Sequence, residues 1–270
     1  MWNEKTNVLV YAVRIHVVLK YCGQLALMLA IITLVPLGFV LSEADWLRCE
    51  RYAILCTGLF LIGGLLSRLR KPAFIQSNEA LTVTAIIFVL SPLLMSWPMM
   101  DVGIPYIDVL FEAVSAVTTT GLSTLGSIEG RPHTFLFARA WMQWYGGLGI
   151  IVLSVALLMG HHAAARRLTD PVDSGETLAS TARIHGRRTL LVYGLLTLLG
   201  MALVWPLCGN GFTALLHVLA AVSTGGFSNY DTSLAGLSSR PAAVAAIPGV
   251  WQKLHENPAN RPITSNPKQI

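Results

Sequence analysis

The sequence is short of charge. Asp, Glu, Lys and Arg make up 12% of its 270 residues, which is about half their share in an average soluble domain. Hydrophobic residues reach 54%, and the mean hydropathy is +0.60. This composition excludes an ordinary soluble domain and predicts an integral membrane protein.

Residues that carry chemistry are scarce as well. The 4 cysteines show no C-x-x-C spacing, and the adjacent His161 and His162 cannot face one metal as readily as histidines three or four positions apart. We therefore expect structural thiols, no zinc or disulfide, and no tightly bound cofactor. The expected spans hold almost no ionisable residues, which argues against an enzyme. The basic residues lack the aromatic interleaving of a nucleic-acid module, so no nucleic-acid partner is expected.

Long apolar segments are what the chain does contain. A helix needs roughly 20 apolar residues to cross a bilayer. Five segments approach that length: about Tyr21 to Leu41, Tyr52 to Leu66, Ala80 to Trp97, Phe135 to Met159 and Thr189 to Leu207. We predict an all-α polytopic membrane protein with about five transmembrane helices.

The charge of the connecting loops predicts their orientation. Basic residues follow the second and fourth expected spans: Arg68, Arg70, Lys71, Arg166, Arg167, Arg183, Arg187 and Arg188. The loops on the other side are mixed or acidic. Because basic loops stay on the cytoplasmic side, we expect these loops and the N-terminus to be cytoplasmic.

Two short segments look like one device used twice. VTTTGLS from Val117 to Ser123 and VSTGGFS from Val222 to Ser228 each follow an apolar, helix-like segment too short to cross a bilayer. One copy alone would be read as a strand end or a loop. Irregular backbone at membrane depth is tolerated only where it is buried in protein or lines a wet cavity, and inward carbonyls and hydroxyls can replace the water shell of a cation. The pair predicts two re-entrant pore-helix and filter loops along an ion pathway.

The two units align when Gly121 is placed on Gly225, an offset of 104 residues (225 − 121). In this register we expect Gly121 and Gly225 to take the positive-φ turns of their loops, because glycine does so at little steric cost. Each short helix would direct its C-terminus, which carries a partial negative charge, at its loop. That end favours a cation.

Three ordered motifs then carry a family resemblance. They are FEAVSAVTTTG from Phe111 to Gly121, RAWMQWYGGLGII from Arg139 to Ile151, and AVSTGGFS from Ala221 to Ser228. Together they resemble the Trk/Ktr/HKT superfamily of potassium uptake proteins, and most closely its bacterial Trk-type pore-forming subunit. The resemblance runs from about Lys71 to Leu237, and the two helices before it match that subunit's N-terminal pair in pattern.

The resemblance implies a pseudo-fourfold pore in the bacterial inner membrane, whose filter strands bind potassium through backbone carbonyls. It also implies that this filter excludes sodium less strictly than the filter of tetrameric potassium channels does. The implied filter residues are Thr118, Thr119, Thr120, Gly121, Val222, Ser223, Thr224 and Gly225, with potassium at Thr119, Thr120, Ser223 and Thr224. The implied inner helix after the first filter contains Trp141, Gln143, Trp144, Gly146, Gly147 and Gly149. Implied partners are a cytosolic nucleotide-binding gating subunit and a second copy of the pore protein in a homodimer.

Arg139 stands near the outer end of an expected span. An Arg there either snorkels to lipid headgroups or pairs with an acid, and Asp108 or Glu112 could be that acid. We favour a role in packing and orientation over direct contact with the ion. Asp108 is also expected to cap its short helix.

These features divide the chain into an N-terminal helical hairpin (1–71), a first helix–loop–helix unit (72–165), an incomplete second unit (166–237) and a disordered tail (238–270). The third and fourth filters of the family pattern are absent, so we expect a truncated member. The favoured function is potassium uptake as the pore-forming subunit of a Trk-type system. The alternatives are a non-conducting remnant or scaffold and, least favoured, a membrane-embedded enzyme.

Overall fold

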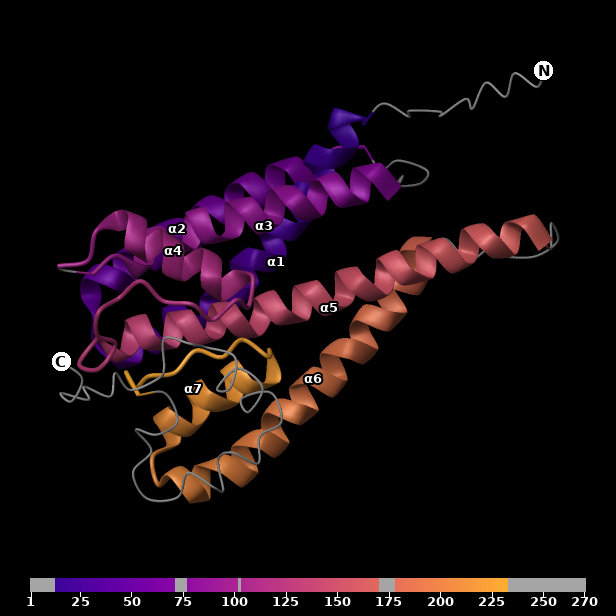
Figure 1. Cartoon of the computed structure of the whole chain (residues 1–270). Helices are drawn as coiled ribbons and strands as arrows, with labels where there is room; N and C mark the ends of the chain where they lie inside the picture. The colour runs from indigo at the N-terminus through magenta and orange to yellow at the C-terminus, as the bar shows by residue number, and fades with distance from the viewer. Residues whose placement is uncertain (1–12, 71–76, 102, 170–177, 233–270) are drawn as a thin grey trace, which may run out of the picture.

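The computed structural model describes residues 13–70, 77–101, 103–169 and 178–232, and the side chains at 13–70, 78–101, 103–152, 154 and 186–232. Helices dominate these ranges and no strand occurs in them (Figure 1): α1 (Ile15–Ser42), α2 (Trp46–Ser67), α3 (Ser77–Met99), α4 (Tyr106–Val117), α5 (His133–Thr169), α6 (Leu178–Cys208) and α7 (Gly211–Val222). The all-α prediction is confirmed. Several predictions fall outside the described residues: the tail 238–270, Lys71, and the side chains of His161, His162, Arg166, Arg167 and Arg183.

Four helices in the described part of the chain are long and apolar enough to cross a membrane: Ile15–Ser42, Trp46–Ser67, Asn78–Met99 and Gly186–Cys208. They confirm four of the five expected spans. The fifth lies within α5, which is helical throughout the expected segment. Its side chains from 155 onward are outside the described residues.

Helix α5 lies between two groups of helices, α1 to α4 and α6 with α7. α1 and α2 form an antiparallel hairpin beside α3, and α3, α4 and α5 pack on one another (Figure 1). α5 and α6 converge at one end and diverge toward the other, and α7 lies in the wedge between them (Figure 1). The short helices α4 and α7 therefore both pack against α5. The domain boundaries given above stay a prediction.

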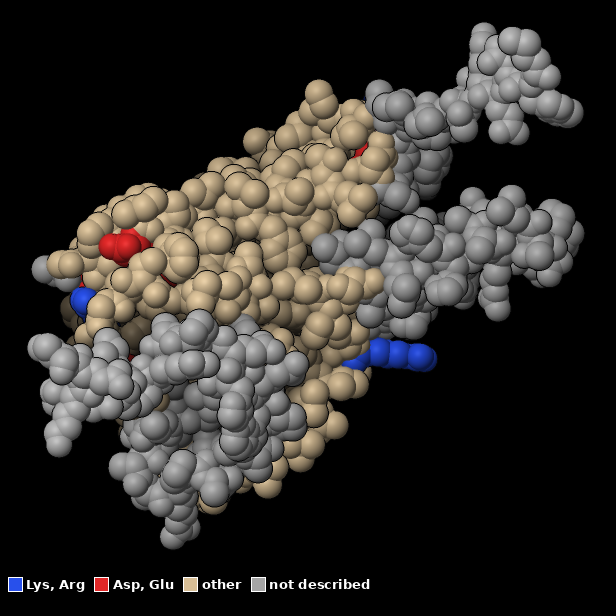
Figure 2. Space-filling view, viewed as in Figure 1, with Lys and Arg blue, Asp and Glu red and all other residues tan. Residues whose placement is uncertain are grey.

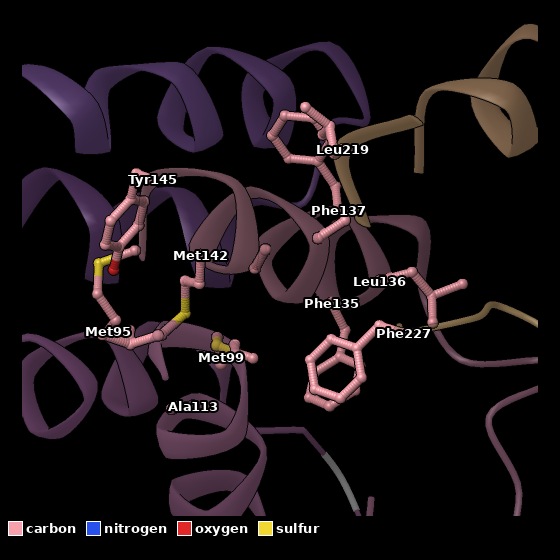
Figure 3. Close-up of a cluster of buried hydrophobic side chains, with 14 of the residues drawn as sticks. Met95, Met99, Ala113, Phe135, Leu136, Phe137, Met142, Tyr145, Leu219 and Phe227 are labelled. Atoms are coloured by element: carbon pink, nitrogen blue, oxygen red, sulfur yellow. The ribbon is translucent and has the colours of Figure 1, made fainter. Parts of the chain in front are cut away.

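The core runs from α1 and α2 through the place where α3, α4 and α5 meet, and it continues to α7 and the segment after it. Figure 3 shows its side chains, among them Met95, Met99, Ala113, Phe135, Leu136, Phe137, Met142, Tyr145, Leu219 and Phe227. The outer surface is apolar too, since Leu191, Leu198 and Leu203 of α6 are 65%, 70% and 70% exposed. On the face shown in Figure 2, charged residues of the described part lie only toward the two ends of the helices. Such a surface suits lipid rather than water.

Ion pairs fix one end of the bundle. Arg48 of α2 pairs with Asp45, and its Nη2 lies 2.7 Å from Asp101 Oδ1. Its Nη1 also donates to Thr134 Oγ1 at 3.2 Å. Asp45 caps α2 by accepting from the backbone N–H of Arg48 at 3.3 Å. This network joins the α1–α2 turn to the end of α3 and the start of α5.

Candidate ion-binding loops

The two short helices are copies in length and in how they end. α4 and α7 have 12 residues each, at an offset of 105 (211 − 106). Thr118 and Ser223 are their C-caps, and each hydroxyl donates to the backbone carbonyl four residues earlier, at 2.8 and 2.9 Å. The predicted offset of 104 is therefore wrong by one residue.

Backbone conformation sets the same register. Thr119 and Thr224 have φ values of +55° and +53°, and Gly121 and Gly226 have +73° and +79°. The positive φ predicted for Gly121 is confirmed. The one predicted for Gly225 is wrong, because Gly226 makes that turn.

The corrected register moves the second loop by one residue. Val222 is the last residue of α7, so it belongs to the helix rather than to the loop. Gly225 takes the place of Thr120, since their N–H groups donate to the backbone carbonyls five residues earlier, at 2.8 and 2.9 Å. The candidate loops are 118–121 and 223–226.

The two loops touch at their glycines. A Cβ built on Gly121 would overlap the carbonyl oxygen of Gly225 and would lie 3.4 Å from the carbonyl carbon of Gly226. The positive φ of Gly121 also disfavours any side chain there. Two segments far apart in the sequence thus bring their backbones together, while Thr118, Thr120 and Thr224 remain exposed.

α5 packs against both units. A Cβ on Gly146 would overlap the carbonyl oxygen of Val117, and one on Gly147 would lie 2.9 Å from Ser223 Cβ and 2.8 Å from Tyr193 Oη. Small residues allow backbones to approach this closely in membrane helices. Gly146 and Gly147 therefore allow α5 to approach both units closely.

The other predicted residues of this helix do different things. Gln143 Oε1 accepts from the backbone N–H of Phe227 at 3.4 Å, so this side chain also meets the second loop. Trp141 and Trp144 donate their indole N–H groups to α1 and α6, at 3.0 and 2.9 Å. Gly149 would make only an ordinary contact through an added Cβ, which indicates no need for glycine there.

Glu112 of α4 supports the first loop. Its Oε1 accepts from Ser123 Oγ at 2.6 Å and from the backbone N–H of Thr124 at 3.1 Å. Its Oε2 lies 2.7 Å from Arg139 Nε, and both side chains are buried. Of the two acids expected as partners of Arg139, Glu112 is the one that pairs.

Arg139 also reaches the residue that follows the second loop, because its Cζ lies 4.0 Å from the centre of the Phe227 ring. A cation over an aromatic face is attracted by the negative face of the ring. The expected capping of α4 by Asp108 is wrong, since Pro105 is the N-cap and no side chain caps this helix end. Asp108 lies in the first turn.

A hydrogen-bonded latch joins the segments that follow the two loops. Asp231 Oδ1 accepts from the backbone N–H of Ile128 at 2.6 Å, and its Oδ2 accepts from Ser127 Oγ at 2.8 Å. Glu129 Oε1 accepts in turn from the backbone N–H of Asp231 at 3.2 Å. The hydrogen bond from Ile128, followed by that from Ser127, holds the pKa of Asp231 below its usual value. Sequence reasoning missed this latch, because nothing local links residues 103 positions apart.

The loops offer oxygen rather than fixed charge. Within the described ranges there is no group of three or more His, Cys, Asp or Glu that could hold a metal ion. The loops present peptide carbonyls and hydroxyls at the C-terminal ends of α4 and α7, where the partial negative charge of a helix favours a cation. The fold and loops together define a polytopic helical membrane protein with a partial repeat of helix–loop units.

Comparison with known proteins gives the family. The chain belongs to the TrkH family, described as cation transport protein, whose family model matches residues 63–251. The Trk system potassium uptake protein TrkH of Escherichia coli K12 is 37% identical over 136 residues, which are 47% of this chain and 27% of that protein. The Trk system potassium uptake protein TrkI of Halomonas elongata is 32% identical over 235 residues, or 83% of this chain and 46% of that protein.

The fold has a solved counterpart. The crystal structure of the potassium transporter TrkH from Vibrio parahaemolyticus matches with a TM-score of 0.65 and 26% sequence identity, covering 87% of this chain and 48% of that one. The chain thus spans half or less of the length of these relatives. Its family is a cation transporter family and not an enzyme family.

Proposed function

We propose that this chain forms part of a potassium pathway of a Trk-type uptake system, with potassium as the transported ion. The observation that carries the proposal is the meeting of the two loops, in which Gly121 admits the carbonyl oxygen of Gly225 at contact distance. The loops 118–121 and 223–226 would bind the ion through backbone carbonyls, with Thr119, Thr120, Ser223 and Thr224 contributing as predicted and Gly226 replacing Val222 in the set. Family membership and the potassium uptake proteins among the relatives support this reading.

Ion retention by the purified full chain tests the proposal. The probe is radioactive rubidium, a potassium mimic, with potassium and sodium as competitors. The wild type should retain rubidium and release it to potassium at lower concentration than to sodium. Gly121→Ala should reduce retention at least tenfold, because a methyl group would displace the second loop. Gly126→Ala is the matched control in the same segment, since a Cβ there meets nothing within 4 Å. Equal retention by Gly121→Ala and the wild type would overturn the assignment.

A non-conducting member of the family is the second candidate. The exposure of Thr118, Thr120 and Thr224 favours it, because the residues of a complete filter are surrounded by protein on every side. Growth at low potassium of a bacterium that lacks its own potassium uptake separates the two. Rescue supports a pore, whereas membrane insertion with rubidium retention but no rescue supports the non-conducting form.

The setting and partners complete the proposal. Arg68 and Arg70 follow α2, and Arg187 and Arg188 lie in the first third of α6. The end of α2 and the start of α6 lie toward the same end of the bundle (Figure 1). By the positive-inside rule this end faces the cytoplasm of a bacterial inner membrane, as does the N-terminus. A cytosolic nucleotide-binding gating subunit would dock there, and a second copy would complete a homodimer. We propose no enzymatic activity and no cofactor.

A further inference from the structure

The corrected register places His217 of α7 where α4 has Glu112, at the same offset of 105 (217 − 112). Both side chains are buried, with 3% and 0% exposure. Glu112 supports the loop that follows its helix by accepting from Ser123 and Thr124. No contact of His217 with the loop that follows its own helix has been described so far.

The repeat continues beyond the loops to a serine. Ser123 Oγ accepts from the backbone N–H of Leu125 at 3.2 Å, and Ser228 Oγ accepts from the backbone N–H of Tyr230 at 3.1 Å. Both hydroxyls therefore keep their hydrogen for another acceptor. In the first unit that acceptor is Glu112, whereas the hydroxyl hydrogen of Ser228 has no acceptor in the described part of the second unit.

His217 offers an acceptor in the right place. Its Nδ1 lies 2.8 Å from the carbonyl oxygen of Thr213. A carbonyl can only accept, so Nδ1 carries the hydrogen and Nε2 of the neutral ring is left with a lone pair. Nε2 is buried and has no hydrogen-bond partner among the described residues. The ring of His217 lies 6.1 Å from the ring of Tyr230, so the segment after the second loop is its neighbour.

We infer that the hydroxyl of Ser228 donates to Nε2 of His217, directly or through one water, and that His217 is the positioning residue of the second loop. The first loop is thus held by a carboxylate and the second by a neutral imidazole. Any effect of this contact on ion binding rests on the proposed function, whereas the contact between Ser228 and His217 does not depend on it.

Hydrogen exchange of the full chain in detergent, read by mass spectrometry, tests the contact without any ion. His217→Phe and Ser228→Ala should each raise the exchange rate of the peptide covering 223–232 several-fold, and the peptide covering 118–125 should keep its wild-type rate. His217→Gln should restore most of the protection, because its amide oxygen can accept the same hydrogen bond. The double variant His217→Phe, Ser228→Ala should exchange no faster than the faster single variant.

Two outcomes would overturn the inference: additive effects of the two single variants, or a His217→Gln protein that exchanges as fast as His217→Phe. If His217→Phe does not fold, Ser228→Ala decides the question, because unchanged exchange of the 223–232 peptide in that variant also overturns the inference. An intact exchange pattern in a protein that retains no rubidium would sink the proposed function and leave the contact standing.

Discussion

Arg139 contacts Phe227 across two units of the fold, with its Cζ 4.0 Å from the ring centre, while its Nε lies 2.7 Å from Glu112 beneath the first loop. One buried cation on α5 therefore touches the support of the first loop and the residue that follows the second. Removing it should affect both at once.

Arg139→Gln should destabilise the protein by about 3–5 kcal/mol, because it leaves the buried carboxylate of Glu112 without a counter-charge. The double variant Glu112→Gln, Arg139→Gln should recover part of this loss. Unfolding by denaturant in detergent measures both. Arg70→Gln is the control, since Arg70 is exposed. Additive losses in the double variant would contradict the coupling.

Gly146→Ala should lower the melting temperature, because the new methyl group would overlap the carbonyl oxygen of Val117. Overpacking of this kind typically costs about 1–3 kcal/mol. Gly194→Ala in α6 is matched in residue type and helix setting, but a Cβ there meets nothing within 4 Å. Thermal unfolding of the two variants side by side should show a loss only for the first.

Asp45→Ala should cost about 0.5–2 kcal/mol through loss of the cap of α2. Burial raises the pKa of Asp45, but hydrogen bonds from Arg48 and Thr134 outweigh it and hold that pKa below its usual value. A lowered folded-state pKa means that this stability is complete above the unfolded value of about 3.9 and is lost as pH falls through the folded value. Melting temperatures between about pH 6 and about pH 3 should fall less steeply for Asp45→Asn than for the wild type.

Asp231→Ala should speed hydrogen exchange at Ile128, because the amide loses its acceptor. The pKa of Asp231 is lowered, as that of Asp45 is. The protection of the Ile128 amide should therefore be present near neutral pH and be lost as Asp231 is protonated in acid. Glu50→Ala is the control for loss of an exposed negative charge. Unchanged exchange at Ile128 would show that the latch does not hold in solution.

Apolar length predicted most of the fold. Four spans and both short helices were found where their runs of hydrophobic residues lie, because lipid requires long apolar helices. The register of the repeat could not be predicted in the same way. The second loop has Gly225 and Gly226 in succession, and either can turn with positive φ. The hydrogen bonds back to α7 and the positive φ of Gly226 decide between them.

The sequence predicted which residue types form the candidate site, but it predicted fewer of the contacts that these residues make. Glu112 was one of two possible partners for Arg139, because both acids lie on the same short helix. The cap expected of Asp108 failed because α4 begins directly after Pro105 and Asp108 falls inside the first turn. The latch at Asp231 depends on how two distant segments meet, and the residues on either side of it give no such signal.

Gly146 and Gly147 are consecutive, so they point about 100° apart around α5, one toward Val117 and the other toward Ser223. The contact with Val117 is made to its backbone, so it persists whatever side chain stands at 117. Selection against larger residues therefore falls on Gly146 itself, and no exchange at Val117 could compensate for a side chain there.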